Sequence, residues 1–287
     1  MVVPETAPFE ERETADRTGS AALPGRPWER RRGELTRIFT RIESHYDRLN
    51  RILSLGLDRG WREWTARSMD APGPWLDLAS GTGDLAVHVF RRRDRARSQP
   101  ILIRSDLVPT LLPVGARKLA RLGGSPESEA PGLGCEMDHL PFATASLGGI
   151  CQGFALRHCR DYPGFFRELF RVLRPGGCIA ILDMRYPAGR VAGFYRFYFR
   201  AVLPRIAVLL GGDRDAYRFL VDSVRSMPPE STLLDALRDA GFTDVASRPG
   251  FLGSVRLLLA RRPAALAGSA EAAYSGPSPR NVSKGEG

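Results

Sequence analysis

The feature that most constrains the fold of this chain is a glycine turn that lies between a short apolar strand and a helix. Residues 75–79 are apolar apart from Asp77, as expected of a strand buried in a parallel sheet, and Gly81 and Gly83 follow directly. Two glycines permit a tight turn, and the helix that the turn opens presents unpaired N–H groups to a ligand. The same pattern also occurs in turns that bind nothing, so the glycines alone do not establish a site.

Strands and helices alternate over the rest of the chain. Apolar residues at helical spacing predict helices over most of 34–68, with a break near Gly56, then from Asp161 to a stop at Pro175-Gly176-Gly177, and over 231–240 after a Ser231 cap. Short apolar runs predict strands at 75–79, at 101–106, near 135–137, and at 149–154, 178–182 and 255–260. This alternation predicts an α/β fold with a mostly parallel sheet and right-handed crossovers.

Acidic residues follow the predicted strands in a pattern typical of an adenosine site. Asp106 ends the second strand, where a carboxylate can accept hydrogen bonds from both ribose hydroxyls, although it could also cap the next helix. Glu136 and Asp138 follow the third strand, just ahead of Leu140-Pro141-Phe142, where an adenine would lie. The ligand is then a nicotinamide dinucleotide or S-adenosylmethionine. Asp77 favours the second, since a carboxylate beside the turn suits an ammonium or sulfonium charge and repels a pyrophosphate.

The composition predicts a cytoplasmic globular protein. Of the 287 residues, 43% are hydrophobic and 26% charged, and no uninterrupted apolar run reaches the roughly 18 residues of a spanning helix. The N-terminus lacks the basic-then-apolar layout of a signal peptide, and the four cysteines, without C-x-x-C spacing, favour a reducing compartment. The cysteines and His139 also lack paired ligand spacing, so we expect no metal site.

The net charge of +10 would suggest a nucleic-acid partner, but its distribution weakens that interpretation. Lys118 and Lys284 are the only lysines among the 42 basic residues, so the charge is almost entirely arginine. Residues 1–33 and 264–287 have the composition of disordered tails and carry balanced charge, which leaves the excess in one domain over 34–263. Because no nucleic-acid recognition module is present, we expect no nucleic-acid partner.

Four stretches of the sequence together resemble one enzyme family. Residues 76–84, Leu-Asp-Leu-Ala-Ser-Gly-Thr-Gly-Asp, resemble the cofactor loop of class I S-adenosylmethionine-dependent methyltransferases. Residues 46–50 (Tyr-Asp-Arg-Leu-Asn, followed by 53–56 and Trp61), 154–158 (Phe-Ala-Leu-Arg-His) and 212–228 are similar to the signatures of the ubiquinone/menaquinone-biosynthesis C-methyltransferases (UbiE-type). The resemblance spans residues 37–260.

This resemblance implies a fold, a cofactor and a set of contacts. The fold would be Rossmann-like, a seven-stranded mostly parallel sheet with an antiparallel edge strand, within a methyltransferase domain over 34–263. The cofactor would be S-adenosyl-L-methionine. By the resemblance, the residues in contact with it are Thr82, Asp106, Glu136 and Met137, and the turn itself adds Asp77, Gly81 and Gly83.

The expected reaction, by the same resemblance, is C-methylation of a polyprenyl quinol ring, demethylmenaquinol to menaquinol in menaquinone or ubiquinone biosynthesis. Arg157 is the candidate for stabilising a ring oxyanion, His158 for a general base or a hydrogen-bonding group, and Tyr46 for closing the pocket. The chain departs from the family at Gly153, Ala155 and His158, where serine, glycine and asparagine are usual. A small-molecule O- or C-methyltransferase for a phenolic or polyketide substrate, and a non-catalytic relative, therefore remain alternatives.

One aromatic segment suggests contact with a lipid substrate or a membrane. It contains Phe194, Tyr195, Phe197, Tyr198 and Phe199, interleaved with arginines. The segment either lines the entrance for a polyprenyl tail, with arginines near anionic headgroups, or caps the sheet with buried aromatics. The sequence thus predicts a lipophilic quinol partner and a possible peripheral membrane position, and it predicts no particular oligomeric state.

Overall fold

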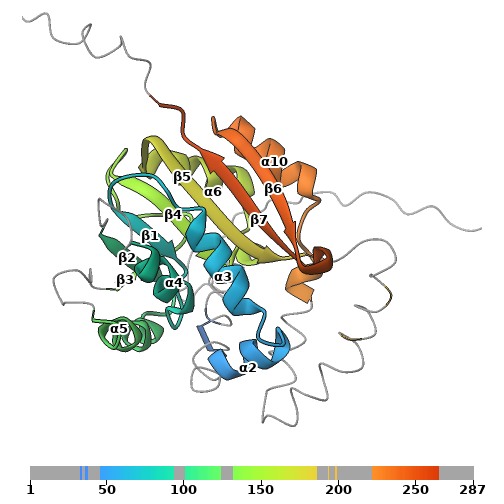
Figure 1. Cartoon of the computed structure of the whole chain (residues 1–287). Coiled ribbons are helices and arrows are strands. Elements are labelled where there is room, and N and C mark those ends of the chain that lie inside the picture. Colours follow the sequence, from blue (N-terminus) through green and yellow to red (C-terminus); the bar gives the residue numbers. More distant parts are fainter. Residues whose placement is uncertain are drawn as a thin grey trace, which may run out of the picture.

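A seven-stranded sheet with helices on both faces forms the centre of the molecule (Figure 1). The computed structural model describes residues 33, 36–37, 46–93, 101–123, 132–185, 193, 198 and 222–264. The strand order is β3-β2-β1-β4-β5-β7-β6. The strands are β1 (Trp75–Leu78), β2 (Leu102–Asp106), β3 (Leu133–Gly134), β4 (Leu147–Gly153), β5 (Leu173–Met184), β6 (Thr243–Gly250) and β7 (Val255–Arg261).

The helices are short and follow the predicted pattern. They are α2 (Tyr46–Leu53), α3 (Asp58–Arg67), α4 (Asp84–Arg93), α5 (Leu112–Ala120), α6 (Tyr162–Val172) and α10 (Glu230–Asp239), with single turns of 3-10 helix at η2 (Pro109–Leu111), η3 (Leu156–His158) and η5 (Phe251–Gly253). The break at Gly56 is confirmed, with a left-handed φ of 77° between α2 and α3. The Asp161 cap is also confirmed, because its carboxylate accepts the Gly164 N–H at 3.0 Å.

The strand directions confirm the expected mostly parallel sheet. β1 to β5 pair in parallel, and β7 runs antiparallel to both β5 and β6. The antiparallel strand β7 therefore lies between β5 and the edge strand β6. Because β1, β2, β3, β4 and β5 are parallel, their carboxyl ends meet at one edge, where ligands of such sheets bind.

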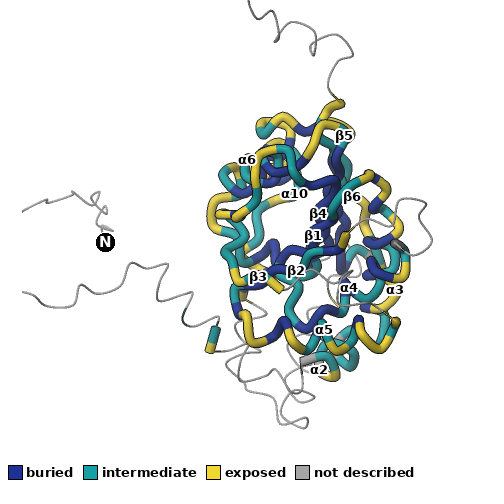
Figure 2. Tube along the Cα trace, turned by 90° about the vertical axis from the view of Figure 1, so that its left-hand side faces the viewer, coloured by how far each residue is buried: buried dark blue, intermediate teal, exposed yellow. Residues whose placement is uncertain are grey.

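Two apolar clusters fill the two faces of the sheet, and the strands themselves are the most buried part of the chain (Figure 2). One cluster packs α6 and α10 on the sheet, with Phe165, Phe166 and Leu237 at its centre. The other packs α3, α4 and α5 on the opposite face, with Val89 and Leu119. Successive residues of β1, β4, β5 and β7 alternate between the clusters, so these strands are buried on both faces, whereas the edge strands β3 and β6 are half-buried or exposed.

The structure differs from the predicted elements in several places. α5 was not predicted, and β5 begins at Leu173, so the predicted helix stop at 175–177 lies within this strand. α10 begins at Glu230 after Pro229, which makes no side-chain cap, so the predicted Ser231 cap is wrong. β3 has only two residues and ends before Cys135. β6 was not predicted as a strand. Much of the sequence evidence lies outside the described residues, namely residues 1–32 and 265–287, the 212–220 part of the last signature, and the aromatic segment apart from Tyr198.

Within the described part of the chain, no helix combines the length and the apolar character needed to cross a bilayer.

Candidate active site

The glycine turn connects β1 to α4 through left-handed backbone. Gly81 and Gly83 have φ values of 54° and 79°, and Ala79 at 55° also lies in this region. A Cβ on Gly83 would come 2.7 Å from the Gly115 Cα, so glycine allows α4 and α5 to approach closely. A Cβ on Gly81 would meet nothing within 4 Å. The turn is therefore tight on one side and open on the other, as a backbone that receives a ligand must be.

Asp106 lies where the sequence predicts it, at the end of β2, and it holds the turn. Its carboxylate accepts the Gly81 N–H at 2.7 Å and the Val108 N–H at 2.8 Å. Burial raises the pKa of Asp106, and these backbone hydrogen bonds oppose the rise. Each carboxylate oxygen keeps a further lone pair, so the group can still accept a hydrogen bond from a ligand.

Asp77 lies beneath the turn rather than at its surface. Its side chain is completely buried, accepts the Ser80 hydroxyl at 2.7 Å and contacts the Cys151 Sγ at 3.8 Å. Burial raises the pKa of Asp77 to about 6, although the Ser80 hydrogen bond lowers it. The carboxyl thus stabilises the turn from below, and its direct contact with a ligand stays a prediction.

A pocket opens at the carboxyl ends of β1, β2 and β3. It brings together two predicted cofactor residues, Glu136 and Met137, and the predicted base, His158. The full lining is Leu78, Ala79, Leu107, Cys135, Glu136, Met137, Asp138, His158, Cys159 and Arg160. Segments that follow β1, β2, β3 and β4 therefore converge on one cavity. The other predicted site residues are not part of its lining, and their contacts with a ligand stay predictions: Tyr46, Asp77, Gly81, Thr82, Gly83, Asp106 and Arg157.

Arg157 does not line this pocket but is held just behind it. The Asp183 carboxylate on β5 accepts its backbone N–H at 3.0 Å and its Nη1 at 2.8 Å, and both side chains are buried. This double contact fixes the orientation of η3, and hence of the neighbouring His158. The guanidinium Nε has no hydrogen-bond partner in the described residues.

Helix α2 is tied to the turn by a network of charges. Asp47 accepts hydrogen bonds from the Thr82 hydroxyl and from the Lys118 ammonium, and Lys118 also donates to Asp84 at 2.6 Å. Burial raises the pKa of Asp84, but the Lys118 hydrogen bond and nearby arginines outweigh burial and lower it overall. Tyr46 begins α2, next to this network, and its predicted role stays a prediction.

Comparison with known proteins identifies the family. Residues 29–255 match the ubiE/COQ5 methyltransferase family. The chain belongs to this family.

Relatives of known name agree with this assignment. The chain is 36% identical over 208 residues to the demethylmenaquinone methyltransferase of Deinococcus radiodurans, which covers 71% of this chain and 83% of the relative. It is 35% identical over 226 residues to the enzyme of the same name from Roseiflexus castenholzii, covering 77% and 90%. A candidate S-adenosyl-L-methionine-dependent methyltransferase structure from Methanococcus maripaludis has a TM-score of 0.51 at 12% identity, covering 77% and 92%, and supports the fold.

Membership of the ubiE/COQ5 methyltransferase family confirms the predicted enzyme class, a methyltransferase that uses S-adenosylmethionine. The sequence analysis did not identify two residues that position the site, Lys118 through Asp47 and Asp84 and Asp183 through Arg157. Lys118 contacts a carboxylate 71 positions away in the sequence, which no local pattern reveals. Asp183 directly follows an apolar strand segment, and an acidic residue at the end of a buried strand is the signal by which the sequence could have indicated a site residue.

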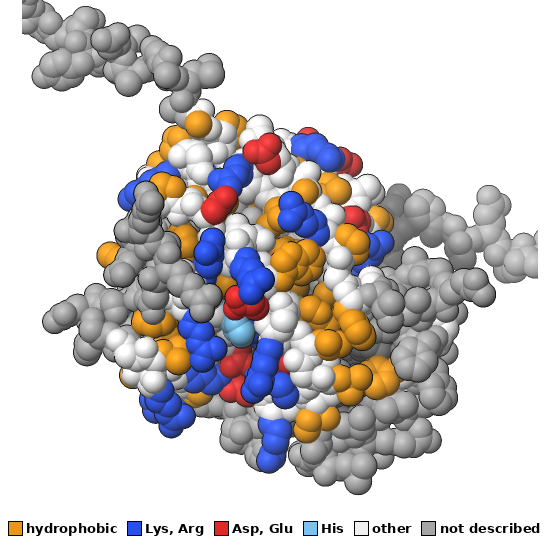
Figure 3. Space-filling model, viewed as in Figure 1, with side chains coloured by type: hydrophobic (Ala, Val, Ile, Leu, Met, Phe, Trp, Pro, Cys, Tyr) orange, Lys and Arg blue, Asp and Glu red, His pale blue; other side chains and the backbone are white. Residues whose placement is uncertain are grey.

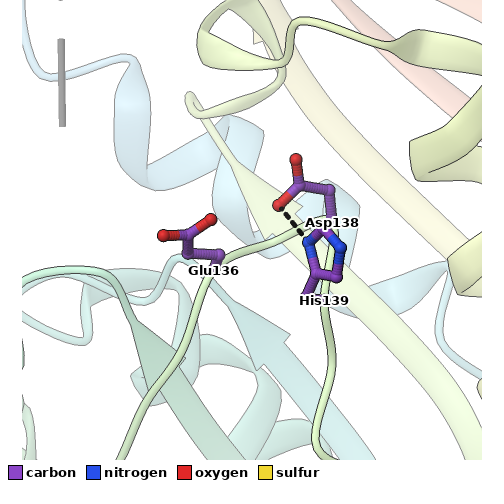
Figure 4. Close-up of side chains that lie close together, drawn as sticks. All are labelled: Glu136, Asp138 and His139. Atoms are coloured by element: carbon purple, nitrogen blue, oxygen red, sulfur yellow. Dashed lines mark hydrogen bonds and ion pairs between the residues drawn. The ribbon is translucent and has the colours of Figure 1, made fainter. Parts of the chain in front are cut away.

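Glu136 and Asp138 of the pocket lining form a small group with the neighbouring His139 (Figure 4). Their possible ligand atoms lie within 4.8 Å of one another, and His139 Nδ1 is 3.2 Å from the Asp138 carboxylate. The His139 side chain is exposed. Exposed groups of this kind are common without a metal, so we assign no ion to this group.

Proposed function

We propose that this protein transfers a methyl group from S-adenosyl-L-methionine to a ring carbon of a polyprenyl quinol, converting demethylmenaquinol to menaquinol. The family and the two relatives named demethylmenaquinone methyltransferase support this substrate class. The observation that carries the proposal is the pocket, where the predicted cofactor residues Glu136 and Met137 meet His158.

The residues around the turn are suited to the cofactor. The space over Gly81 is open, so the turn can receive a methionine moiety. Each carboxylate oxygen of Asp106 keeps a lone pair that can accept a hydrogen bond from a ribose hydroxyl. Glu136 and Met137 then lie beside the adenine. Bound there, S-adenosylmethionine supplies an electrophilic methyl group on a sulfonium.

The chain has to activate the ring carbon and orient it. His158 lines the pocket, and its imidazole is the candidate to take the proton of a ring hydroxyl, which pushes electron density onto the reacting carbon. The fixed Arg157 offers positive charge behind that oxygen. The ring carbon forms the new C–C bond as the methyl–sulfur bond breaks, which leaves S-adenosylhomocysteine, and the carbon then releases its hydrogen as a proton.

The decisive assay uses labelled S-adenosylmethionine with a short-chain demethylmenaquinol and locates the label by mass spectrometry. Label on the ring carbon supports the proposal, and no transfer to quinol contradicts it. Arg157→Ala should lower kcat about 10²-fold and leave cofactor binding intact. Arg167→Ala, an exposed arginine on α6, is the matched control and should leave kcat unchanged.

A second candidate is methylation of a smaller phenolic or polyketide oxygen or carbon. It rests on Ala155 and His158, which stand where the family resemblance expects glycine and asparagine, and His158 lines the pocket itself. A substrate panel separates the two candidates: preference for a prenylated quinol favours the first, and equal turnover of an unprenylated phenol favours the second.

We also infer that the protein works as a peripheral protein on the cytoplasmic side of a membrane, where its lipophilic substrate would be. Leu55 and Phe251 support this inference, because they are 71% and 46% exposed and are held outward by left-handed backbone. Phe251 follows β6 and packs against Trp61. Sedimentation with anionic liposomes at low salt tests the inference, and absence of binding contradicts it.

A further inference from the structure

A short segment that follows β3 forms one wall of the pocket. Glu136, Met137 and Asp138 line the cavity from a single turn of this segment (Figure 4). At the start of the segment, the Cys135 N–H donates to the Asp106 carbonyl at 3.1 Å. Because the turn lies outside the helices and named strands, its shape depends on the contacts that hold its two ends.

The other end of the turn is held by two side chains of α6, Glu168 and Arg171. Glu168 Oε1 accepts the Leu140 N–H at 2.8 Å, and Arg171 Nη2 donates to the Leu140 carbonyl at 3.1 Å. Arg171 Nη1 also donates to the Phe142 carbonyl at 2.9 Å. We call Glu168 and Arg171 the α6 clamp. It binds both polar backbone groups of Leu140, whose side chain is buried in the core.

The α6 clamp is itself rigid, because its two side chains hold each other. Arg171 Nε donates to Glu168 Oε2 and Arg171 Nη2 to Glu168 Oε1, both at 2.8 Å. The hydrogen bonds from Arg171 lower the pKa of Glu168, and those to Glu168 raise the pKa of Arg171, so both groups stay charged near neutral pH. A planar guanidinium fixed on a carboxylate presents its remaining N–H groups in set directions.

A third contact supports the turn from within the sheet. Gln152 of β4 is fully buried, and its Nε2 donates to the Met137 Sδ at 3.9 Å. The turn is therefore held from β2 through the Asp106 carbonyl, from β4 through Gln152 and from α6 through the clamp. Of these three, the clamp makes the largest number of polar contacts with the segment.

The chemistry of the turn suits an adenine. Ionised carboxylates such as Glu136 and Asp138 can only accept hydrogen bonds, and the exocyclic amino group of adenine is a donor. A hypoxanthine base has a carbonyl oxygen at the same place, which offers such a carboxylate no hydrogen bond. Selection between the two bases therefore requires that the carboxylates are held within hydrogen-bond distance of the base.

We propose that the α6 clamp positions residues 136–138 against the adenine of the cofactor, and that Glu168 and Arg171 thereby set both the affinity for S-adenosylmethionine and the selectivity for adenine. This inference rests on the proposed function, because it takes the pocket to be the adenine site. Glu168 and Arg171 are positioning residues. Neither lines the pocket, and both act through Leu140 on the turn.

Calorimetric titration of the full chain with S-adenosylhomocysteine and S-inosylhomocysteine tests the proposal. The wild type should bind the adenine compound at least about tenfold more tightly than the hypoxanthine compound. Arg171→Met should weaken S-adenosylhomocysteine binding roughly tenfold and lower this selectivity about threefold or more, because several hydrogen bonds that fix the turn are lost. Glu168→Gln keeps an oxygen for the Leu140 N–H and should fall between the two. Arg167→Met, at an exposed position on the same helix, is the control and should match the wild type.

Steady-state kinetics add a readout that a loss of stability would not produce. In Arg171→Met, the KM for S-adenosylmethionine should rise roughly tenfold while kcat at saturation stays within about twofold of the wild type, because the clamp touches no reacting atom. A variant that was only less stable would contain less active protein. Its Kd values for the two compounds, and their ratio, would be those of the wild type.

Two outcomes overturn the inference. The first is an Arg171→Met variant with a lower Tm and unchanged selectivity, which would make the clamp purely structural; if Arg171→Met does not fold, the selectivity of Glu168→Gln decides in the same way. The second is a wild type that binds both compounds equally well, which would show that residues 136–138 do not distinguish the base. If the variants lose selectivity as expected but the wild type methylates no quinol, the proposed function fails and the inference about the clamp stands.

Discussion

At the scale of single residues, Asp77 makes the stability of the fold depend on pH. Its carboxyl is fully buried, and burial raises its pKa from 3.8 to about 6 in the folded chain. Between these values the folded state binds a proton that the unfolded state has lost. The contribution of Asp77 to the free energy of unfolding should therefore fall by about 3 kcal/mol in total as pH rises from below 3 to above 7, with most of the fall between pH 4 and 6.

Asp77→Asn removes this titration but can keep the hydrogen bond from Ser80. The difference in unfolding free energy between the variant and the wild type should grow in favour of the variant over the same pH window. Denaturant titrations at several pH values measure it. Asp235→Asn, at an exposed position on α10, serves as the control. A difference that stays constant from pH 4 to 7 contradicts the prediction.

Asp106 is the residue whose loss should weaken cofactor binding most directly. In Asp106→Asn, an amide NH₂ replaces one of the two oxygens that accept the Gly81 and Val108 N–H groups, so one backbone donor loses its partner. Such a loss costs about 1–3 kcal/mol, which corresponds to roughly tenfold weaker binding or more. Calorimetric titration with S-adenosylhomocysteine measures the affinity, and an unchanged Kd would speak against the assignment.

Local chemistry explains which site residues the sequence could predict. Gly81, Gly83 and Asp106 belong to a strand–turn–helix pattern whose geometry is set by neighbours in the chain, and the structure places them at the expected strand ends. Asp183 and Arg256 could not be predicted in the same way. Their position opposite each other depends on β5 and β7 meeting in one register, and a buried charge looks like a surface charge in the sequence.

At the scale of elements, Lys118 links α2 to the core of the fold. Lys118→Met removes the hydrogen bonds to Asp47 and Asp84 that hold α2 against α4 and α5. Because the three side chains are partly exposed, the loss should be roughly 1 kcal/mol, felt mainly by α2. Amide hydrogen exchange in Tyr46–Leu53 should become about fivefold faster.

The control for this experiment lies on the same stretch of chain. Arg121→Met changes an exposed cation just past the end of α5 and should leave exchange in α2 unchanged. Exchange that accelerates equally in α2 and α6 after Lys118→Met would indicate global destabilisation and would contradict a local link.

Elements with strong periodicity were predictable, and the weak ones were not. α6 has a capping aspartate and a regular apolar face, and its start follows from them, whereas it ends at Val172, ahead of the predicted stop at Pro175, which lies within β5. β6 has Pro249 and Gly250 at its end and mostly half-buried or exposed residues, so no apolar alternation marks it. An edge strand of this type exists because β7 offers it a partner, which is a tertiary effect.

At the scale of the whole molecule, the net charge of +10 raises the question of a basic surface. On the face shown in Figure 3, basic side chains alternate with acidic and apolar ones rather than forming one stripe. Several arginines are engaged inside the fold, among them Arg157 with Asp183 and Arg62 with Asp58 at 2.6 Å. Part of the basic charge is thus used in ion pairs within the fold.

The proposed extent of the catalytic domain, 34–263, gives a prediction for the molecule as a whole. Residues 1–33 and 264–287 carry balanced charge and little apolar periodicity, so their removal should leave the core intact. For a chain of this size, 1 kcal/mol corresponds to roughly 2–4 °C in Tm, and the change on truncation should be smaller than that. Calorimetry of the 34–263 fragment, with affinity for S-adenosylhomocysteine as a second readout, tests this. A larger fall in Tm, or a weaker affinity, would contradict the prediction and show that residues outside 34–263 contribute to the stability of the fold or to cofactor binding.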